Sequence, residues 1–406
     1  MKFKVLPGFR DFLPAELAIR RAIESAWRQA SVGAGFEEID GPVLEPLELF
    51  TAKSGEEIVS QLYTFLDKGG RKVALRPEMT PSIARMVAGR AAGLPKPIKW
   101  FCLPEFYRYE KPQRGRTRAF RQWNVDVFGS DDPAADAEAI AVAVEGLRSL
   151  GVGSDDVMVR INDRRLLRRQ LRKIDVGEAD EPEVLALIDR LERDEGAAGR
   201  LEALLGTSRA RELAGWCERM PVEAGDELGA VLEACQDFGI GDFMEPDFRI
   251  VRGLDYYTGP VWEIFDRARS LRSVAGGGRY DELIELLGGP KLPALGFGMG
   301  DAVLGELLQE RGLLPTSAPR VDVVVVPIGA EMRSAARRVV AKLRAEGTRA
   351  DSPYGAPRLG KAMKTAESAG AARVIFVGPD EWQDESVKVK DLASGRETIV
   401  RLENLS

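Results

Sequence analysis

The clearest hydrophobic pattern in the chain consists of two strand-like runs separated by a polar segment. The first run, Trp100–Tyr109, is apolar and aromatic, which is typical of a strand buried on at least one face. In the second run, residues 122–128, polar and apolar side chains alternate with a period of two. We therefore predict an antiparallel hairpin whose returning strand presents Gln122, Asn124 and Asp126 on one face.

Helical and strand-like patterns flank this hairpin on both sides. Apolar residues at helical spacing predict a helix from Pro14 to about Gly33 and another over residues 134–150. Residues from about 165 to 240 are charged and rich in Ala and Leu, which predicts a module of amphipathic helices. Short strands are expected at 36–39, 63–67, 72–75 and 158–161, with the middle two paired as a hairpin.

The C-terminal part of the chain has a different pattern. Residues 313–319 are rich in Pro and Ser and predict a linker. Beyond it, strand and helix patterns alternate, beginning with the β-branched run Val321–Ile328, and this order predicts a parallel sheet covered on both faces. We predict an α+β domain with an antiparallel sheet at 1–318, the helical module (165–240) being an insertion, and an α/β domain at 319–406.

Composition limits the chemistry that this chain can perform. Its 406 residues are 44% hydrophobic and 30% charged, enough for two or three domains, and the net charge is −6. It contains no histidine, and Cys102, Cys217 and Cys235 are scattered, which excludes Ser-His or Cys-His catalysis and a disulfide framework. Without an apolar run of about 18 residues or a secretory signal, we expect a cytoplasmic protein.

Positive charge is concentrated in the polar segment of the predicted hairpin. Six cations and a single acid, Glu110, lie between Arg108 and Arg121 in a chain that is acidic overall. Five of the six are Arg, whose planar fork suits bidentate binding of phosphate. A solvated hairpin tip is one interpretation; a nucleotide or nucleic-acid site is the other, and the adjoining polar strand face favours it.

Two further stretches carry candidate polar site residues. Glu78 and Thr80 lie between two prolines, so that both side chains share one face of an extended segment, although Thr80 could instead cap a helix. Arg252 is followed by Tyr256 and Tyr257, and we expect strands on either side to hold it at the end of a rigid element. The alternative for Arg252 is an ion pair with Asp255 or Glu263. A glycine-rich loop is expected at 275–281, where triple Gly lets backbone approach a ligand.

These stretches together resemble one protein family. FYRYEKPQRGRTRAFRQWNVDVFG resembles motif 2 of the class II aminoacyl-tRNA synthetases, in the form carried by histidyl-tRNA synthetases. RGLDYYTGPVWE and AGGGRYD resemble two signatures of that same family. The helix, strand and Pro42 near the N-terminus resemble motif 1, which builds a dimer interface, and the C-terminal region resembles the family's anticodon-binding domain. The motif 2 match rests on Arg108, Glu110, Arg116, Phe120 and Gln122.

The resemblance implies a homodimeric enzyme that activates histidine with ATP and transfers it to the 3′ end of its tRNA, with Mg²⁺ bridging the phosphates. In-line attack on a phosphate builds negative charge, so fixed cations are the main requirement. The implied catalytic residues are Arg108 and Arg252. The implied histidine-binding residues are Glu78, Thr80, Gln122, Asp126, Tyr256 and Tyr257, and the implied ATP-binding residues are Arg108, Glu110, Arg116 and Arg279.

One motif departs from the family pattern. At the position of motif 3, LGFGMGDAVL carries Ala302 and Val303 where most relatives have Glu-Arg, and that Arg contacts ATP. Arg279 or Arg116 could compensate. Two alternatives therefore stay open: a regulatory subunit of ATP phosphoribosyltransferase, which shares this fold without the chemistry, and a tRNA-sensing binding module.

Overall fold

We analysed a computed structural model, which describes residues 3–51, 59–177, 179–191, 194–219, 226–252, 256–315, 319–355 and 357–405. The chain divides into two units, residues 1–315 and 316–406, near the boundary that the sequence predicts. Each unit has a sheet of its own. The two units are therefore described separately.

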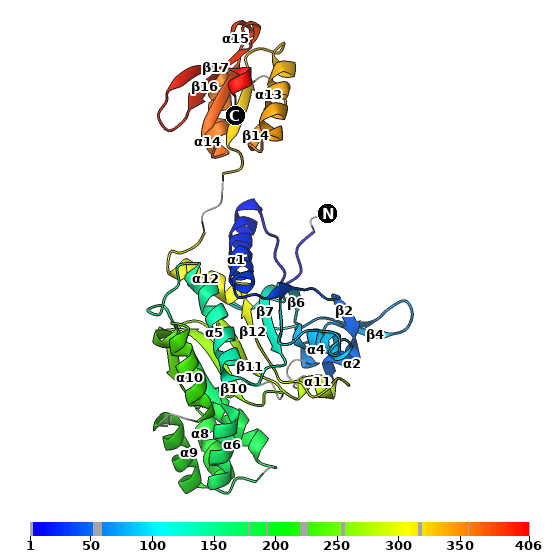
Figure 1. Ribbon diagram of the computed structural model, residues 1–406, viewed down its shortest axis with the longest axis vertical. Helices are drawn as coiled ribbons and strands as arrows, with labels where there is room; N and C mark the ends of the chain where they lie inside the picture. The colour runs from blue at the N-terminus through cyan, green and yellow to red at the C-terminus, as the bar shows by residue number, and fades with distance from the viewer. Residues whose placement is uncertain are drawn as a thin grey trace. The chain divides into compact units, whose positions relative to one another are not determined.

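A large, mainly antiparallel sheet lies at the centre of the first unit (Figure 1). Within the described residues it has nine strands, in the order β1-β5-β7-β12-β11-β10-β8-β9, with β6 paired to β7. Among the described strands of this sheet, only β1 with β5 and β8 with β9 pair in parallel. Their bounds are β1 Glu37–Glu38, β5 Ile98–Cys102, β6 Glu105–Tyr107, β7 Ala119–Phe128, β8 Val157–Asp163, β9 Met244–Pro246, β10 Pro260–Asp266, β11 Ala275–Arg279 and β12 Ala294–Gly300.

The predicted hairpin is confirmed, with its first arm divided into two strands. Both β5 and β6 pair antiparallel with β7. The side chains of β7 alternate with a period of two. Trp123, Val125 and Val127 enter one core, and the alternating polar residues, Gln122, Asn124 and Asp126, lie on the other face. The polar face of β7 is therefore left for a site.

The two faces of this sheet are covered by different helices. Helices α1 (Pro14–Gly33) and α5 (Pro133–Arg148) pack on the face that carries Trp123, whose ring stacks on Trp27 with centroids 5.9 Å apart. On the other face, α4 (Thr80–Ala88) and α11 (Leu283–Leu286) pack against Phe128 and its neighbours (Figure 1). The site face is therefore covered only in part by helices.

Helices α1 and α5 begin at residues that are typical of a helix N-terminus. Pro14 begins α1, and the side chain of Asp132 accepts a hydrogen bond from the Ala134 N–H at the start of α5. The interpretation of Thr80 as a helix cap is wrong, because Thr80 is the first residue of α4 and Met79 holds the capping position. The hydroxyl of Thr80 is thus not required for capping.

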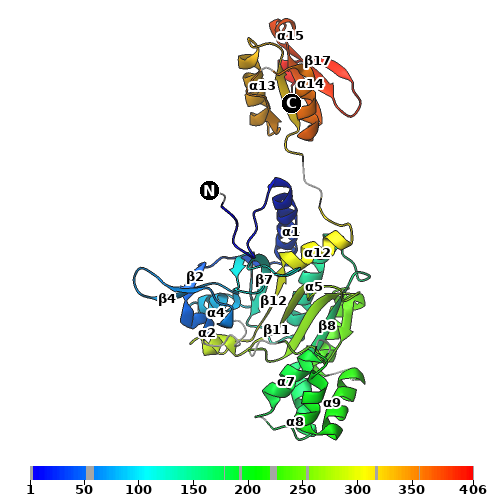
Figure 2. The same ribbon diagram turned by 180° about the vertical axis from the view of Figure 1, so that it is seen from behind.

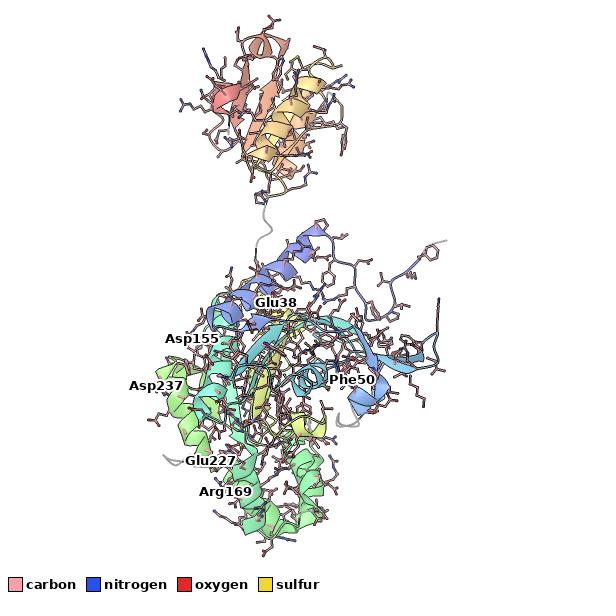
Figure 3. The ribbon with its side chains drawn as sticks, turned by 45° about the vertical axis from the view of Figure 1, so that its right-hand side comes forward. Glu38, Phe50, Asp155, Arg169, Glu227 and Asp237 are labelled. Carbon is pink, nitrogen blue, oxygen red and sulfur yellow. The ribbon has the colours of Figure 1, made fainter. Side chains whose placement is uncertain are left out.

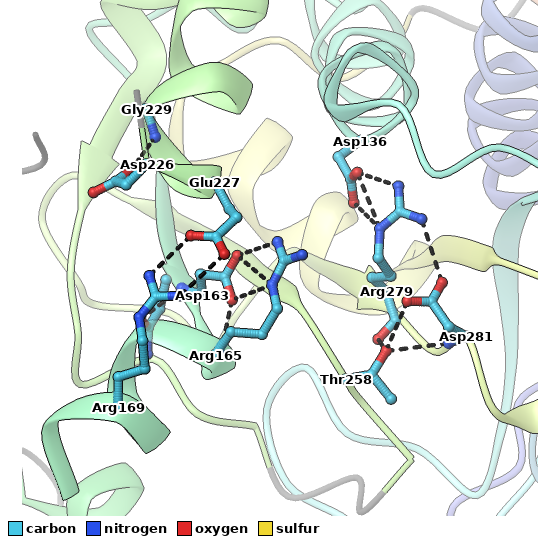
Figure 4. Close-up of polar contacts among 11 residues, drawn as sticks. Asp136, Asp163, Arg165, Arg169, Asp226, Glu227, Gly229, Thr258, Arg279 and Asp281 are labelled. Atoms are coloured by element: carbon cyan, nitrogen blue, oxygen red, sulfur yellow. Dashed lines mark hydrogen bonds and ion pairs between the residues drawn. The ribbon is translucent and has the colours of Figure 1, made fainter. Parts of the chain in front are cut away.

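Two smaller assemblies complete the first unit. A three-stranded sheet contains β2 (Leu44–Pro46), β4 (Lys72–Leu75) and β3 (Thr64–Leu66), followed by α2 (Leu47–Thr51) on the β2 side, and it confirms the predicted hairpin of β3 and β4. The predicted helical module consists of α6 (Arg164–Lys173), α7 (Glu181–Arg190), α8 (Ala197–Leu205), α9 (Thr207–Arg219) and α10 (Glu227–Asp237), followed by the short η1 (Gly241–Phe243). Arg169 of α6 and Glu227 of α10 lie side by side and form an ion pair at 2.9 Å (Figures 3 and 4).

The second unit follows α12 (Asp301–Glu310) and confirms the predicted α/β pattern. Its sheet has the order β14-β13-β15-β16-β17, with β13 parallel to both β14 and β15. Helices α13 and α14 pack on opposite faces, against alternate residues of β13 (Figure 2). The bounds are β13 Val323–Pro327, α13 Arg333–Ala345, β14 Ala350–Asp351, α14 Leu359–Ser368, β15 Arg373–Val377, α15 Pro379–Gln383, β16 Ser386–Asp391, β17 Glu397–Arg401 and η2 Leu402–Asn404.

None of the helices in the described ranges is long and apolar enough to cross a membrane.

The packing of α5 on the sheet generates a stability prediction. A Cβ added to Gly146 would lie 2.6 Å from Cζ3 of the buried Trp123 ring, whereas a Cβ on Gly305 in α12 would meet no atom within 4 Å. Gly146→Ala should therefore destabilise the first unit by about 1–3 kcal/mol through overpacking. Gly305→Ala, the matched control, should stabilise it by up to about 1 kcal/mol through helix propensity. Urea denaturation measures both, and equal effects would contradict this account of the packing.

Candidate active site

The site is built on rows of residues that run across the sheet. Asn124 on β7 pairs with Gly298 on β12, Gly298 pairs with Gly276 on β11, and Gly276 pairs with Glu263 on β10. Cross-strand partners share a face, so these residues lie on the face opposite α5. Gly298 and Gly276 are neighbours across the sheet and have no side chains, so they leave open space over β12 and β11.

The glycines of β11 make room for particular side chains. A Cβ on Gly276 would overlap Nη1 of Arg252, and a Cβ on Gly278 would lie 2.9 Å from the ring of Tyr257. The prediction of a glycine-rich loop at 275–281 is therefore wrong for its first five residues, which form β11. The close approach is made by the protein's own Arg252 and Tyr257.

Two adjoining cavities of about 750 and 310 Å³ lie over this glycine floor. The walls that they share include Arg108, Glu110, Arg116, Gln122 and Arg252. The smaller cavity is also lined by Glu78, Thr80, Asn124, Tyr256, Tyr257 and Tyr280. Nine of the residues named from the sequence are therefore brought together: Glu78, Thr80, Arg108, Glu110, Arg116, Gln122, Arg252, Tyr256 and Tyr257.

Arg252 is held in a loop and not at the end of a strand, contrary to expectation. Its φ of 61° lies in the left-handed region that non-glycine residues seldom adopt, as residues at functional sites sometimes do. Its backbone N–H donates to the carboxylate of Asp189 at 3.2 Å, and its Nη1 donates to the carbonyl of Trp262 at 3.3 Å. Asp255, one of its proposed partners, lies outside the described residues.

Arg108 and Arg116 are both held by groups of the first unit. Nε of Arg108 donates to the carbonyl of Pro77 at 2.9 Å, and its guanidinium lies 5.3 Å from the centre of the Phe120 ring. Arg116 forms an ion pair with the buried carboxylate of Glu110. Glu110 therefore orients a cation of the motif 2 loop toward both cavities.

Buried tyrosines surround the carboxylate of Glu78. The hydroxyl of Tyr256 donates to Glu78 at 3.4 Å, and the rings of Tyr256 and Tyr257 lie 5.1 Å apart. Burial raises the pKa of both tyrosine hydroxyls, so they are protonated donors at neutral pH. The smaller cavity thus offers a carboxylate and hydroxyl groups in an aromatic surrounding.

Asp126, one of the predicted histidine ligands, is buried behind the wall of the smaller cavity. It is not among the residues that line the cavities, and the hydroxyl of Tyr280 donates to it. Burial raises the pKa of its carboxyl from 3.8 to about 7; the hydrogen bond from Tyr280 opposes this shift, and the charge of Glu78 adds to it. Asp126 therefore acts behind Tyr280, which itself faces the smaller cavity.

Asn124 is a site residue to which the sequence analysis gave no role. It is buried and lines the smaller cavity, and in the described part of the chain its Oδ1 has no hydrogen-bond partner. A buried acceptor without a donor is costly unless a ligand supplies one. Its place between Gln122 and Asp126 in the alternating run was the signal that could have identified it.

Arg279 does not reach either cavity, and the prediction that it binds ATP is corrected. Its Nε lies 3.2 Å from the carboxylate of Asp136 on α5, and its Nη1 lies 3.3 Å from Asp281 (Figure 4). The period of two on β11 turns Gly276 and Gly278 toward the cavity, and it turns Arg279 toward α5. Arg279 thus fixes a helix to the back of the sheet.

Three further arginines line the larger cavity and were not identified from the sequence: Arg249, Arg269 and Arg272. They come from the segments before and after β10, which carry no periodic pattern. Ala302 and Val303 at the start of α12 line the same cavity. Only the tertiary structure brings these segments together.

This antiparallel sheet, with an arginine-rich motif 2 hairpin and a glycine strand leading into a helix, is the catalytic fold of class II aminoacyl-tRNA synthetases. The family model described as histidyl-tRNA synthetase matches residues 8–301, and the anticodon binding domain model matches 322–406. The chain belongs to the histidyl-tRNA synthetase family. It is an aminoacyl-tRNA ligase that joins histidine to its tRNA.

Individual relatives agree over nearly the whole chain. The histidine–tRNA ligase of Opitutus terrae is 43% identical over 99% of this chain and 97% of the relative. That of Natronomonas pharaonis is 40% identical over 98% of this chain and 95% of the relative. The crystal structure of histidyl-tRNA synthetase from Nostoc sp. PCC 7120 has the same fold, with a TM-score of 0.83 at 24% identity, covering 99% of this chain and 98% of that one.

The raised pKa of Asp126 generates a prediction on stability. The folded pKa of about 7 exceeds the value of 3.8 for an ordinary Asp, so Asp126 takes up a proton on folding between these pH values. The stability of the wild type relative to Asp126→Asn should therefore fall as pH rises from about 4 to about 7 and then level off. Urea denaturation of both proteins across this range measures the difference. A difference independent of pH would show that the carboxyl titrates normally.

Proposed function

We propose that histidine occupies the smaller cavity and ATP the larger one, and that the reaction takes place where the two meet. The observation that carries this proposal is the shared wall, in which Arg108 and Arg252 line both cavities. Attack of the histidine carboxylate on the α-phosphate brings negative charges together at such a boundary. Fixed guanidinium groups stabilise that charge without reorganisation.

Arg108 and Arg252 are assigned to the α-phosphate and the histidine carboxylate. Both keep their guanidinium groups in place through bonds to backbone carbonyls, at Pro77 and Trp262 respectively. These carbonyl partners orient both guanidinium groups at the wall that the two cavities share. Arg116, which is paired with Glu110, is assigned to the β- and γ-phosphates.

Recognition of histidine is assigned to the groups around the smaller cavity. Glu78, bonded to Tyr256, accepts from one imidazole nitrogen, and Tyr257 faces the other. The α-ammonium is assigned to acceptors on β7 and α4, namely Gln122, Asn124 and Thr80, with Asp126 behind Tyr280. A site of buried hydrogen-bonding groups rejects analogues that lack the matching groups by factors on the order of 10⁴.

Mg²⁺ is proposed to enter with ATP as part of the substrate. In the described ranges, no group of three or more Cys, Asp or Glu side chains is placed to hold a metal ion. Glu110 at the cavity wall is paired with Arg116. Phosphate oxygens are therefore the proposed main ligands of Mg²⁺, which usually binds in this way.

The two units are proposed to be a catalytic domain (1–318) and an anticodon-binding domain (319–406) of a cytoplasmic homodimer. Exposed apolar side chains on α1 and the small sheet support a contact between copies, among them Val32 and Leu66 at 59% and 65% exposure. Sedimentation equilibrium should give twice the chain mass of 44.5 kDa. A mass of one chain at micromolar concentration would contradict the dimer.

Histidine-dependent exchange of pyrophosphate into ATP tests the activation step. The full chain should catalyse it with Mg²⁺, and EDTA should abolish it. Absence of exchange in correctly folded protein would favour the alternatives, a regulatory subunit of ATP phosphoribosyltransferase or a tRNA-sensing module. Retention of Arg108, Arg252 and both family signatures supports the enzyme.

Arg252→Ala should lower kcat for exchange by at least about 100-fold, as removal of a transition-state donor does. Gly276→Ala should reproduce the loss while leaving Arg252 in the sequence, because the added Cβ overlaps Nη1 of Arg252. The kcat of Arg252→Lys should fall between those of the wild type and Arg252→Ala, since Lys keeps the charge without the planar fork. An unchanged kcat in Arg252→Ala would leave Arg252 with a structural role only; circular dichroism controls for folding.

A further inference from the structure

The start of α12 contributes no positive charge to the larger cavity. Ala302 and Val303 line the cavity at the start of α12. Val303 packs against the motif 2 loop, since a Cβ added to Gly115 would lie 3.2 Å from its Cγ2. ATP carries several negative charges, and their stabilisation needs cations placed around the phosphates. In this chain those cations have to come from other segments.

Most of the arginines around the larger cavity already contact protein groups. Arg114, in the motif 2 loop, is bound by two carboxylates of α12 at 2.9 and 2.6 Å and is not among the cavity-lining residues. The engaged cavity arginines are Arg108 with the Pro77 carbonyl, Arg116 with Glu110, Arg249 with Asp247, Arg252 with the Trp262 carbonyl and Arg269 over the Phe265 ring.

Arg272 differs from these five. It lies between β10 and β11 and lines both cavities. In the ranges that the structure covers, its exposed guanidinium has no hydrogen bond or ion pair. A guanidinium in this state can bind phosphate bidentately without first breaking an internal ion pair.

The loop that carries Arg272 is anchored at both ends. The buried carboxylate of Asp266 accepts from the backbone N–H groups of Ser270 and Leu271 at 2.9 and 3.0 Å. On the other side, the Val274 N–H donates to the Ile264 carbonyl at 2.8 Å. These bonds fix the backbone on either side of Arg272. This backbone position places Arg272 at the wall of both cavities.

We propose that Arg272 binds the phosphate chain of ATP and supplies the positive charge that Ala302 and Val303 do not. The proposal rests on the assignment of the larger cavity to ATP. Arg272 lines both cavities, but its neighbours Leu271, Ser273 and Val274 line only the larger one, so its role is assigned to ATP binding and not to histidine binding.

Exchange kinetics of Arg272→Ala test the proposal. Loss of a charge-assisted hydrogen bond should raise KM for ATP by about 10- to 100-fold, while KM for histidine stays within about twofold of the wild type. Arg272→Lys should recover part of the ATP affinity. The matched control is Arg267→Ala on the same loop, whose guanidinium donates to the Ser154 carbonyl and does not line the cavities; it should leave both KM values unchanged.

Two outcomes overturn the proposal. One is an unchanged KM for ATP in Arg272→Ala, and the other is an equal rise in KM for ATP and for histidine, which would indicate a general loss of site structure. Calorimetric binding of MgATP to the wild type and Arg272→Ala gives the same comparison without turnover. If exchange is absent in the wild type while Arg272→Ala still weakens MgATP binding, the proposed activity fails and the role of Arg272 stands.

Discussion

The alternation of side chains along four neighbouring strands is the constraint on which the site depends. Because β7, β12, β11 and β10 are paired in register, Asn124, Gly298, Gly276 and Glu263 form one row across the sheet. The residues on the opposite face fill the core under α5. A shift of register by one residue would exchange these faces, closing the cavity and exposing the core.

The same alternation assigns opposite tasks to two residues of one strand, β11. On β11, Gly276 leaves space for the guanidinium of Arg252, while Arg279 binds Asp136 behind the sheet. Arg252 therefore lines both cavities, and Arg279 forms an ion pair behind the sheet. Burial alone would make either charge costly. The ion pair with Asp136 offsets that cost for Arg279, whereas the nearby carboxylates of Glu263 and Asp189 favour the charged form of Arg252.

Within the helical insertion, cations of α6 form ion pairs with acids of other helices. Nε of Arg168 lies 2.6 Å from Glu181, and Arg169 binds Glu227 on α10. The first pair joins α6 to the next helix, α7, and the second joins it to the more distant α10, so both cations are engaged within the module. At the cavities, Arg108 and Arg252 instead donate to the backbone carbonyls of Pro77 and Trp262.

The sequence by itself determined the elements and most of the site, because periodicity and motif order are local properties. It predicted the hairpin, the insertion, the α/β unit and nine side chains of the shared cavities. It placed Asn124 on the polar face of the returning strand but gave it no role. It could not place Arg279 or Arg272, since strand pairing with distant segments decides which face of β11 turns to the cavities and which loops reach them. Only the tertiary structure decided that Arg279 meets Asp136, and that Arg272, which has no hydrogen bond or ion pair within the described residues, lines the same cavity as Ala302 and Val303.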